Sequence, residues 1–184
     1  TVPAIGHSVP DFILPATDDQ QIKLSDCRGK NIVLYFYPKD CTPGCTLESQ
    51  DFRDQHKAFL KLETVIFGIS RDNLKLHEKF KTEQQLPFAL LSDSEEMLCN
   101  LFDVIKDKNM YGKKVRGIER STFLIDKKGI LRHEWRKVKV EGHVADVLEK
   151  VPTRSIGTGQ FVIGTSKVRP RMGETFRRDE KLGI

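Results

Sequence analysis

Residues 35–48 read YFYPKDCTPGCTLE, and in this stretch an apolar segment passes into a helical pattern. The apolar run from Asn31 to Tyr37 is ended by Pro38, as is typical of a strand that is buried on both faces. Thr42 is a favoured residue at a helix N-cap, and Pro43 suits the first helical position because its missing N–H is not needed there. The stretch therefore predicts a strand, a short loop and a helix that begins near Pro43.

Cys45 falls in the first turn of this predicted helix. Backbone N–H groups without partners and the positive end of the helix dipole lie at such a position. Thiols at helix N-termini have a lower pKa than free thiols, and the thiolate is the nucleophilic form. Gly44 leaves room for a substrate beside the backbone. A lone intracellular cysteine more often packs as a small apolar side chain, but this context favours Cys45 as a nucleophile.

The rest of the chain alternates strand and helix patterns. A second buried strand is predicted at Glu63 to Ser70. A helix is predicted at Asp72 to Gln85 with Asp72 as its N-cap, and another after Ser92, with Glu95 in the capping-box position. A β-hairpin is predicted next, with strands at Ser121 to Asp126 and Ile130 to Trp135 joined by a turn at Lys127-Lys128-Gly129. A last helix is predicted at about Glu141 to Val151.

This order of elements predicts an α/β sandwich with parallel central strands, completed by an antiparallel hairpin. Residues 1–30 are expected to form extended pieces at its periphery. We expect one domain over residues 1–151 and a basic, Gly-containing, flexible extension over residues 152–184. The extension is open to two interpretations: a solubilising segment, or a weak tether to nucleic acid or an anionic membrane.

Composition and charge narrow the class of protein. The chain has 184 residues, of which 38% are hydrophobic and 31% charged, which excludes a collagen-like or wholly disordered protein. Its longest apolar run, Ile32 to Tyr37, is far shorter than the ~20 residues of a membrane-spanning helix. The net charge is +5, and residues 151–184 hold seven basic against three acidic residues. The remaining residues are therefore almost neutral in total, and we expect no specific binding of nucleic acid.

The chain contains four cysteines, Cys27, Cys41, Cys45 and Cys99. They are too sparse for a disulfide-rich secreted protein and lack the spacing of a zinc site. We therefore expect free thiols, a cytoplasmic location, and neither metal nor cofactor. We expect no secretory leader and no membrane span.

The motif around Cys45 resembles that of the peroxiredoxins. Pro38, Thr42 and Cys45 match the family pattern Pro-x-x-x-Thr/Ser-x-x-Cys, and the match to the bacterioferritin comigratory protein (PrxQ) subfamily continues through Glu48. Further matches follow in the same order at residues 68–70, 90–93 and 117–126. The resemblance covers roughly residues 3 to 150. It implies a thioredoxin-like three-layer sandwich, with a mixed central sheet flanked by helices, and a thiol-dependent peroxidase.

The resemblance also implies roles for site residues. Cys45 would attack hydrogen peroxide or an alkyl hydroperoxide and become a sulfenic acid. Thr42, Arg120 and the N–H groups of Gly44 and Cys45 would donate hydrogen bonds to the peroxide. Pro38 would shield the loop from water. Glu48 would either orient Arg120 or only stabilise the N-terminus of the helix.

The sequence departs from its relatives where the sulfenic acid is resolved. Many PrxQ proteins carry a resolving cysteine five residues after the peroxidatic one, and here that residue is Gln50. Others carry it in the next helix, but residues 72–85 contain no cysteine. Cys41, Cys99 and Cys27 remain as candidates, although Cys99 is expected to pack in the core. We favour a single-cysteine mechanism with thioredoxin, glutaredoxin or a small thiol as reductant.

Other functions remain open from sequence alone. The same cysteine would serve a redox-responsive chaperone or a peroxide sensor. We expect a monomer or weak dimer. The five histidines are expected to be solvated or to cap helices, and Trp135 to lie in the core or at its rim.

Overall fold

The computed structural model describes residues 2–153. Most of the predicted extension, residues 152–184, therefore lies outside the described residues, and the division of the chain at residue 151 stays a prediction. Among residues 2–153, no helix has both the length and the apolar character needed to cross a membrane.

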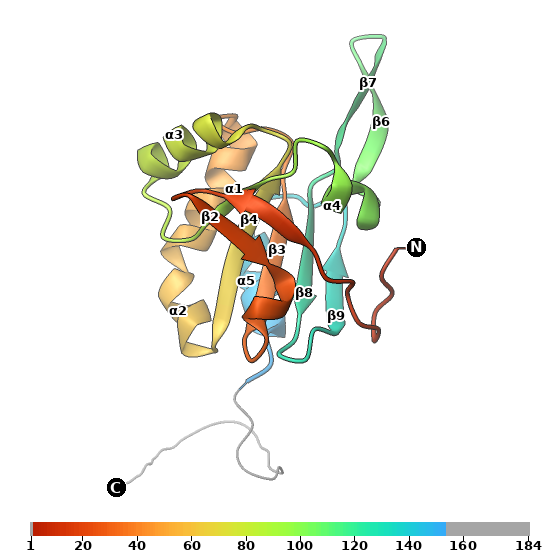
Figure 1. Cartoon of the computed structure of the whole chain (residues 1–184). Coiled ribbons are helices and arrows are strands. Elements are labelled where there is room, and N and C mark those ends of the chain that lie inside the picture. The colour runs from red at the N-terminus through yellow and green to blue at the C-terminus, as the bar shows by residue number, and fades with distance from the viewer. Residues whose placement is uncertain (1, 154–184) are drawn as a thin grey trace, which may run out of the picture. The chain divides into compact units, whose positions relative to one another are not determined.

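A seven-stranded mixed sheet forms the centre of the fold, in the order β2-β1-β5-β4-β3-β8-β9 (Figure 1). The neighbours β3, β4 and β5 are parallel, and the outer strands are antiparallel to their neighbours. The strands are β1 (Ile13–Ala16), β2 (Gln20–Lys23), β3 (Asn31–Phe36), β4 (Thr64–Ser70), β5 (Leu90–Ser92), β8 (Ser121–Ile125) and β9 (Leu131–Trp135). The predicted parallel strands and closing hairpin are thus present.

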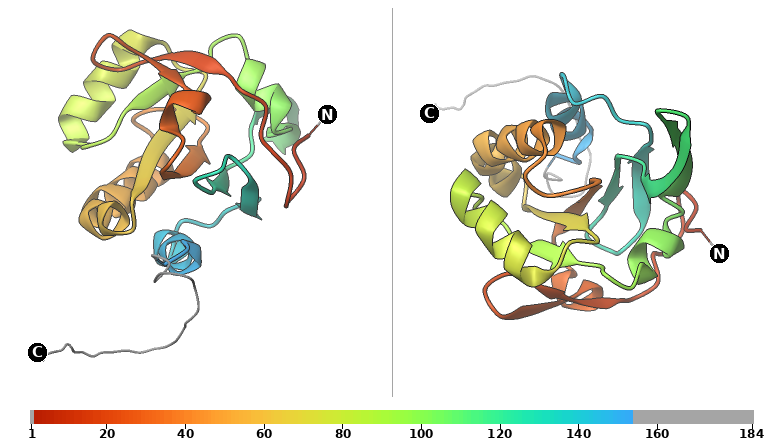
Figure 2. Two further views of the ribbon diagram at one scale, coloured as in Figure 1. Left: turned by 60° about the horizontal axis from the view of Figure 1, so that its bottom comes forward. Right: turned by 90° about the horizontal axis from the view of Figure 1, so that it is seen from above.

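Helices cover both faces of the sheet, which gives three layers (Figure 2). The buried side chains of β3 alternate between two apolar cores. Tyr35 packs with Phe52 and Phe80 on the face of α1, α2, α3 and α5, whereas Phe36 packs with Phe102 on the face of α4. The helices are α1 (Pro43–Asp54), α2 (His56–Lys61), α3 (Leu74–Gln84), α4 (Met97–Leu101) and α5 (His143–Lys150), with a short 3-10 turn at Leu24–Cys27.

A hairpin of two further strands, β6 (Ile105–Met110) and β7 (Lys113–Ile118), stands out from the body (Figure 1). Neither this hairpin nor the short strand β5 was predicted from the sequence. At its tip Tyr111 is fully exposed. Glu96 holds its second strand, because both guanidinium nitrogens of Arg116 donate to the Glu96 carboxylate at 2.6 Å.

Two predicted helix starts are wrong. Asn73, not Asp72, caps α3, since its side-chain oxygen accepts the Leu76 N–H at 2.9 Å. Ser92 does not cap α4, whose N-cap is Glu96. The Asp93 carboxylate accepts the N–H groups of Leu98 and Cys99 instead, at 3.1 and 2.7 Å, so a side chain outside the predicted capping box binds the free N–H groups of the first turn.

Candidate active site

Cys45 lies in the first turn of α1, directly after the loop that leaves β3. The helix starts at Pro43 as expected, and Thr42 occupies the N-cap position with extended backbone. The Thr42 hydroxyl makes no capping bond; it donates to the carbonyl of Lys39 at 2.8 Å. Cys45 is only 1% exposed, and Pro38 at the start of the loop is half-buried. The sulfur is therefore shielded from solvent.

Arg120 contacts both Cys45 and Glu48. Its Nη2 lies 3.4 Å from Cys45 Sγ, and its Nη1 donates to Glu48 Oε1 at 2.7 Å. The pairing of Phe36 with Ser121 in the antiparallel β3–β8 ladder brings Arg120 to the end of β3, beside the loop. The sheet register thus joins residues that are 75 positions apart in the chain.

Gly44 gives Arg120 the space for this contact. A Cβ atom at residue 44 would lie 3.1 Å from Arg120 Nη2. This is tighter than nearly all contacts that real Cβ atoms make. The missing side chain of Gly44 thus makes room for the guanidinium of Arg120, while the approach of a substrate to Gly44 stays a prediction.

Glu48 is completely buried beside Arg120. Burial raises the pKa of its carboxyl to about 7, although the charge of Arg120 acts in the opposite direction. Within residues 2–153, Glu48 Oε2 accepts no hydrogen bond. His143 Nε2 lies 4.0 Å from this oxygen. The contact expected between Glu48 and Arg120 is present. The carboxyl of Glu48 in this contact has a pKa near neutral pH.

His143 is a buried neighbour that the sequence analysis missed. Its Nε2 lies 2.8 Å from the Thr122 hydroxyl, and burial lowers its pKa to about 4, so the ring is neutral at pH 7. The ring of Trp135 meets it edge-on at 5.9 Å, and Trp135 Nε1 donates to Asp146 at 2.8 Å. The expectation of solvated or capping histidines is therefore wrong for His143. Its place beside Val144 on the apolar face of α5 was the available signal.

The other cysteines differ in their access to Cys45. Cys99 is completely buried and Cys27 partly buried against the core on the α4 face of the sheet, whereas Cys45 belongs to the core on the opposite face. Burial raises the pKa of both thiols. Cys41 is exposed on the loop before α1, with Sγ 4.0 Å from a Glu83 carboxylate oxygen. The sheet separates Cys27 and Cys99 from Cys45.

Residues 5–134 match the model of the AhpC/TSA family. The chain belongs to this family. Two relatives are Peroxiredoxin Bcp of Bacillus subtilis, 54% identical over 82% of this chain and 96% of the relative, and Peroxiredoxin Bcp of Xanthomonas campestris, 50% identical over 75% and 86%. These matches confirm the peroxiredoxin of the Bcp/PrxQ type that the motifs indicated.

Solved structures agree with this assignment. A mutant of Xylella fastidiosa PrxQ matches with a TM-score of 0.78 at 41% identity, over 82% of this chain and 96% of that chain. The bacterioferritin comigratory protein of Xanthomonas campestris, whose structures concern alkyl peroxide reduction, matches with a TM-score of 0.73 at 48% identity over 76% and 89%. This peroxiredoxin therefore has the thioredoxin-like fold and is a thiol-dependent peroxidase.

Proposed function

We propose that Cys45 is the peroxidatic residue of this peroxiredoxin and that an external thiol resolves its sulfenic acid. The contact between Arg120 Nη2 and Cys45 Sγ at 3.4 Å is the observation that carries the proposal. A guanidinium keeps its charge throughout the accessible pH range. It stabilises the thiolate of Cys45 and the negative charge that develops when a peroxide bond breaks.

In the first step the thiolate sulfur attacks the nearer oxygen of hydrogen peroxide or of an organic hydroperoxide. A sulfur–oxygen bond forms, the oxygen–oxygen bond breaks, and the departing hydroxide or alkoxide takes up a proton. The products are the Cys45 sulfenic acid and water or an alcohol. Arg120 and the N–H groups of Gly44 and Cys45 are the proposed donors to the peroxide oxygens, and Pro38 excludes water. The Thr42 hydroxyl joins these donors only when it turns away from the Lys39 carbonyl, to which it donates at 2.8 Å.

Glu48 is the proposed positioning residue for Arg120. The bond from Arg120 Nη1 to Glu48 Oε1, 2.7 Å long, leaves Nη2 directed at the sulfur. An ion pair of this kind fixes the plane of the guanidinium as well as its position. The alternative, a simple first-turn acid at the helix N-terminus, fits less well because Glu48 is fully buried.

In the second step an external thiol attacks the sulfenic sulfur. A mixed disulfide forms and water leaves, and a second thiol then releases the Cys45 thiol and carries away the disulfide. Thioredoxin, glutaredoxin or a small thiol supplies these electrons. Two observations support an external reductant. Cys27 and Cys99 pack on the far face of the sheet. The position where many PrxQ proteins carry a resolving cysteine is occupied by Gln50, whose side chain donates to Gln84 at 2.7 Å.

Alkyl hydroperoxides are the proposed substrates besides hydrogen peroxide. The Xanthomonas campestris neighbour is a protein of alkyl peroxide reduction, and its likeness to this chain supports the same substrate class here. The similar proteins are named peroxiredoxins, which favours the peroxidase function over that of a redox-responsive chaperone or sensor.

Mass spectrometry after one equivalent of peroxide tests the single-cysteine mechanism. The wild-type protein should gain one oxygen atom on Cys45, and a sulfenic-acid reagent should trap it. A species lighter by two hydrogen atoms, with Cys45 joined to Cys41, Cys99 or Cys27, would overturn the external resolution while leaving the peroxidase intact. Cys45→Ser should react with no peroxide. Gln50→Cys is the positive control, since it should form the intramolecular disulfide.

A further inference from the structure

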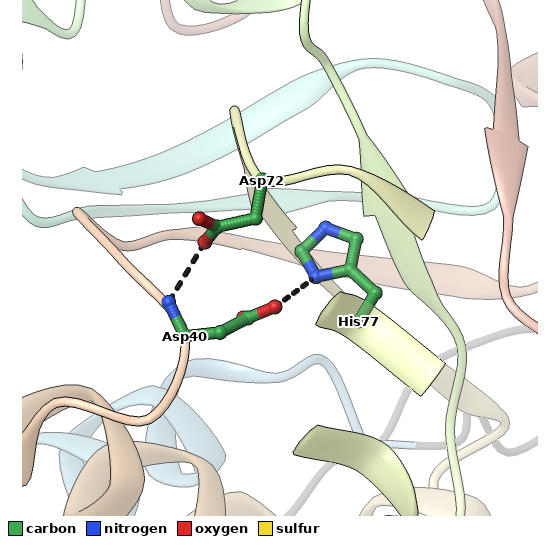
Figure 3. A group of neighbouring side chains, drawn as sticks. All are labelled: Asp40, Asp72 and His77. Atoms are coloured by element: carbon green, nitrogen blue, oxygen red, sulfur yellow. Dashed lines mark hydrogen bonds and ion pairs between the residues drawn. The ribbon is translucent and has the colours of Figure 1, made fainter. Parts of the chain in front are cut away.

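A second group of polar side chains, two of them buried, includes a residue of the loop that precedes α1 (Figure 3). Asp40 comes from this loop, Asp72 follows β4, and His77 lies in α3; Asp40 is 2% exposed and His77 is fully buried. His77 Nδ1 lies 2.6 Å from Asp40 Oδ2, and the Asp40 N–H donates to Asp72 Oδ2 at 2.7 Å. The group thus joins the loop to two other segments.

The composition of this group suits a metal ion, but its donor atoms are already committed. A metal needs a ring nitrogen without a proton. His77 Nε2 lies 2.9 Å from the carbonyl oxygen of Leu91, and Nδ1 faces the Asp40 carboxylate. Asp40 Oδ1 accepts the Tyr37 hydroxyl at 2.6 Å. The group is therefore a hydrogen-bond network and not a metal centre.

The partners of His77 also determine where its protons lie. A carbonyl oxygen can only accept, so Nε2 carries a proton toward Leu91. Nδ1 and Asp40 Oδ2, 2.6 Å apart, form the second hydrogen bond of the ring. Both side chains are buried, so the loss of one partner leaves the other unpaired in a place where water cannot replace it. The Asp40–His77 pair is thus a strong tie between the loop and α3.

This tie holds a part of the loop that would not keep its shape by itself. Asp40 stands five residues before Cys45, and the next residue, Cys41, has a φ of 64°. This left-handed conformation is unfavourable for a residue other than glycine and persists only where its surroundings impose it. The Thr42 bond to Lys39 and the Cys41 contact with Glu83 act on this part of the loop from its surface. Its buried contacts are those of Asp40: the side chain bonds to Tyr37 and His77, and the N–H donates to Asp72.

We propose that His77 is a positioning residue for the peroxidase reaction. By its hydrogen bond to Asp40, His77 keeps the start of α1 ordered during peroxide attack. The same bond limits how often the start of α1 opens and lets a thiol reach the Cys45 sulfenic acid. The second part follows from burial, because Cys45 is 1% exposed and a thiol reaches its sulfur only when the loop or the first turn moves. The inference rests on the proposed peroxidatic role of Cys45.

Two substitutions of His77 separate its two hydrogen bonds. His77→Asn places an amide nitrogen near the position of Nδ1, so it keeps the bond to Asp40 and loses the bond to Leu91. His77→Gln places the nitrogen near Nε2 and does the reverse. Each variant loses one buried hydrogen bond, so a general loss of packing affects both alike. Only His77→Gln releases the loop.

The first measurement is hydrogen exchange of the backbone amides between residues 39 and 46, without Pro43, which has none. The second and third are the rate of sulfenic-acid formation with peroxide and the rate at which the sulfenic acid reacts with a small thiol. His77→Gln should exchange about tenfold faster than the wild type in this segment. Its peroxide step should slow about tenfold and its thiol step should quicken severalfold. His77→Asn should remain within about twofold of the wild type on all three. A general loosening of the protein would change His77→Asn and His77→Gln alike, so the difference between the two variants identifies the bond to Asp40.

Equal exchange rates in His77→Asn and His77→Gln, or wild-type exchange in His77→Gln, would overturn the proposal. If His77→Gln does not fold, Asp40→Asn takes its place: it keeps the shape and an acceptor for Nδ1–H but removes the charge. Its segment should exchange about threefold faster than the wild type, and an unchanged rate overturns the proposal. Exchange needs no peroxide chemistry, so this comparison is valid even if Cys45 proves not to be peroxidatic.

Discussion

At the residue scale, Gly44 sets the distance between Cys45 and the guanidinium of Arg120. Gly44→Ala should slow sulfenic-acid formation about tenfold, because the new Cβ would lie 3.1 Å from Arg120 Nη2 and displace it from the sulfur. The melting temperature should stay equal or rise, since alanine favours a helix over glycine. Stopped-flow kinetics and thermal melts measure the two effects.

Gly117→Ala is the matched control for this substitution. A Cβ there would meet Arg71 Nη2 at 3.8 Å, an ordinary contact, so peroxide kinetics should be those of the wild type. Equal rates for Gly44→Ala and the wild type would contradict the role given to Gly44.

Glu48 gives the stability of the protein a distinct pH dependence. Its carboxyl has a folded pKa of about 7 against an ordinary value of 4.5, so the folded state holds this proton more tightly than the unfolded state does. The contribution to stability is therefore fully present below about pH 4.5 and is lost as the pH rises to about 7, by an order of about 3 kcal/mol.

Glu48→Gln has no such proton. The free energy of unfolding of the wild type, minus that of Glu48→Gln, should therefore fall as the pH rises between these limits, in urea titrations at fixed temperature. His143 acts in the opposite direction, because its lowered pKa adds stability as the pH rises from about 4 to 6.5. It is present in both proteins, but it lies 4.0 Å from Glu48 Oε2, and contacting residues are not independent. The fall above about pH 6.5, beyond the range in which His143 titrates, is therefore the part that Glu48 alone explains. A difference that stays flat or rises would contradict the buried, proton-holding carboxyl.

At the element scale, the β6–β7 hairpin depends on Glu96. Its carboxylate accepts a hydrogen bond at 2.8 Å from Arg71, which follows β4, and two from the Nη1 and Nη2 groups of Arg116 in β7. These hydrogen bonds lower the pKa of Glu96 to about 2. Glu96→Gln weakens the attachment of the hairpin to the body. Trypsin should then cut after Lys108 or Lys113 severalfold faster than in the wild type, as peptide mapping would show.

Asp103→Asn serves as the comparison for Glu96→Gln. Asp103 accepts a single exposed bond from Lys106 at 3.1 Å, and exposed pairs of this kind contribute little. Its cleavage rate should match the wild type. If both variants are cut at the same rate, Glu96 does not anchor the hairpin.

The elements that the sequence predicted are those with an apolar pattern. Asn31 to Tyr37 is buried throughout as β3 and its continuation, and Ser121 to Asp126 is buried as β8. The β6 strand instead carries Lys106, Asp107 and Lys108, and among residues 2–153 its strand partner is β7 alone. Without an apolar face it gives no period-two signal, so propensity and pattern could not find it.

At the scale of the whole molecule, the site depended on pairings that spacing does not encode. Cys45 was identified from local helix physics, whereas Arg120 reaches it only through the β3–β8 register, and only the resemblance to peroxiredoxins indicated it. His77 and His143 were missed because their burial results from helices docking on the sheet. Burial of a polar side chain is a property of tertiary packing, and a single sequence shows it poorly.

A chain that ends after Val151 should keep the peroxidase activity and melting temperature of the full chain within experimental error. The family match ends at residue 134, and every residue of the candidate site lies earlier than residue 151. Peroxide consumption with one thiol reductant and thermal melts compare the two proteins. A truncated protein that melts lower or loses activity would show that residues 152–184 contribute to the folded unit.

Trp135 is the sole tryptophan of the chain, and its position makes the molecule its own optical probe. Its ring lies 5.9 Å from His143, which in turn lies 4.0 Å from Glu48. Indole emission changes in wavelength and intensity with the polarity and the quenching groups around it. With no second tryptophan to dilute the signal, the intrinsic fluorescence of this protein reports from the neighbourhood of Glu48 and the candidate site, without a dye or a label.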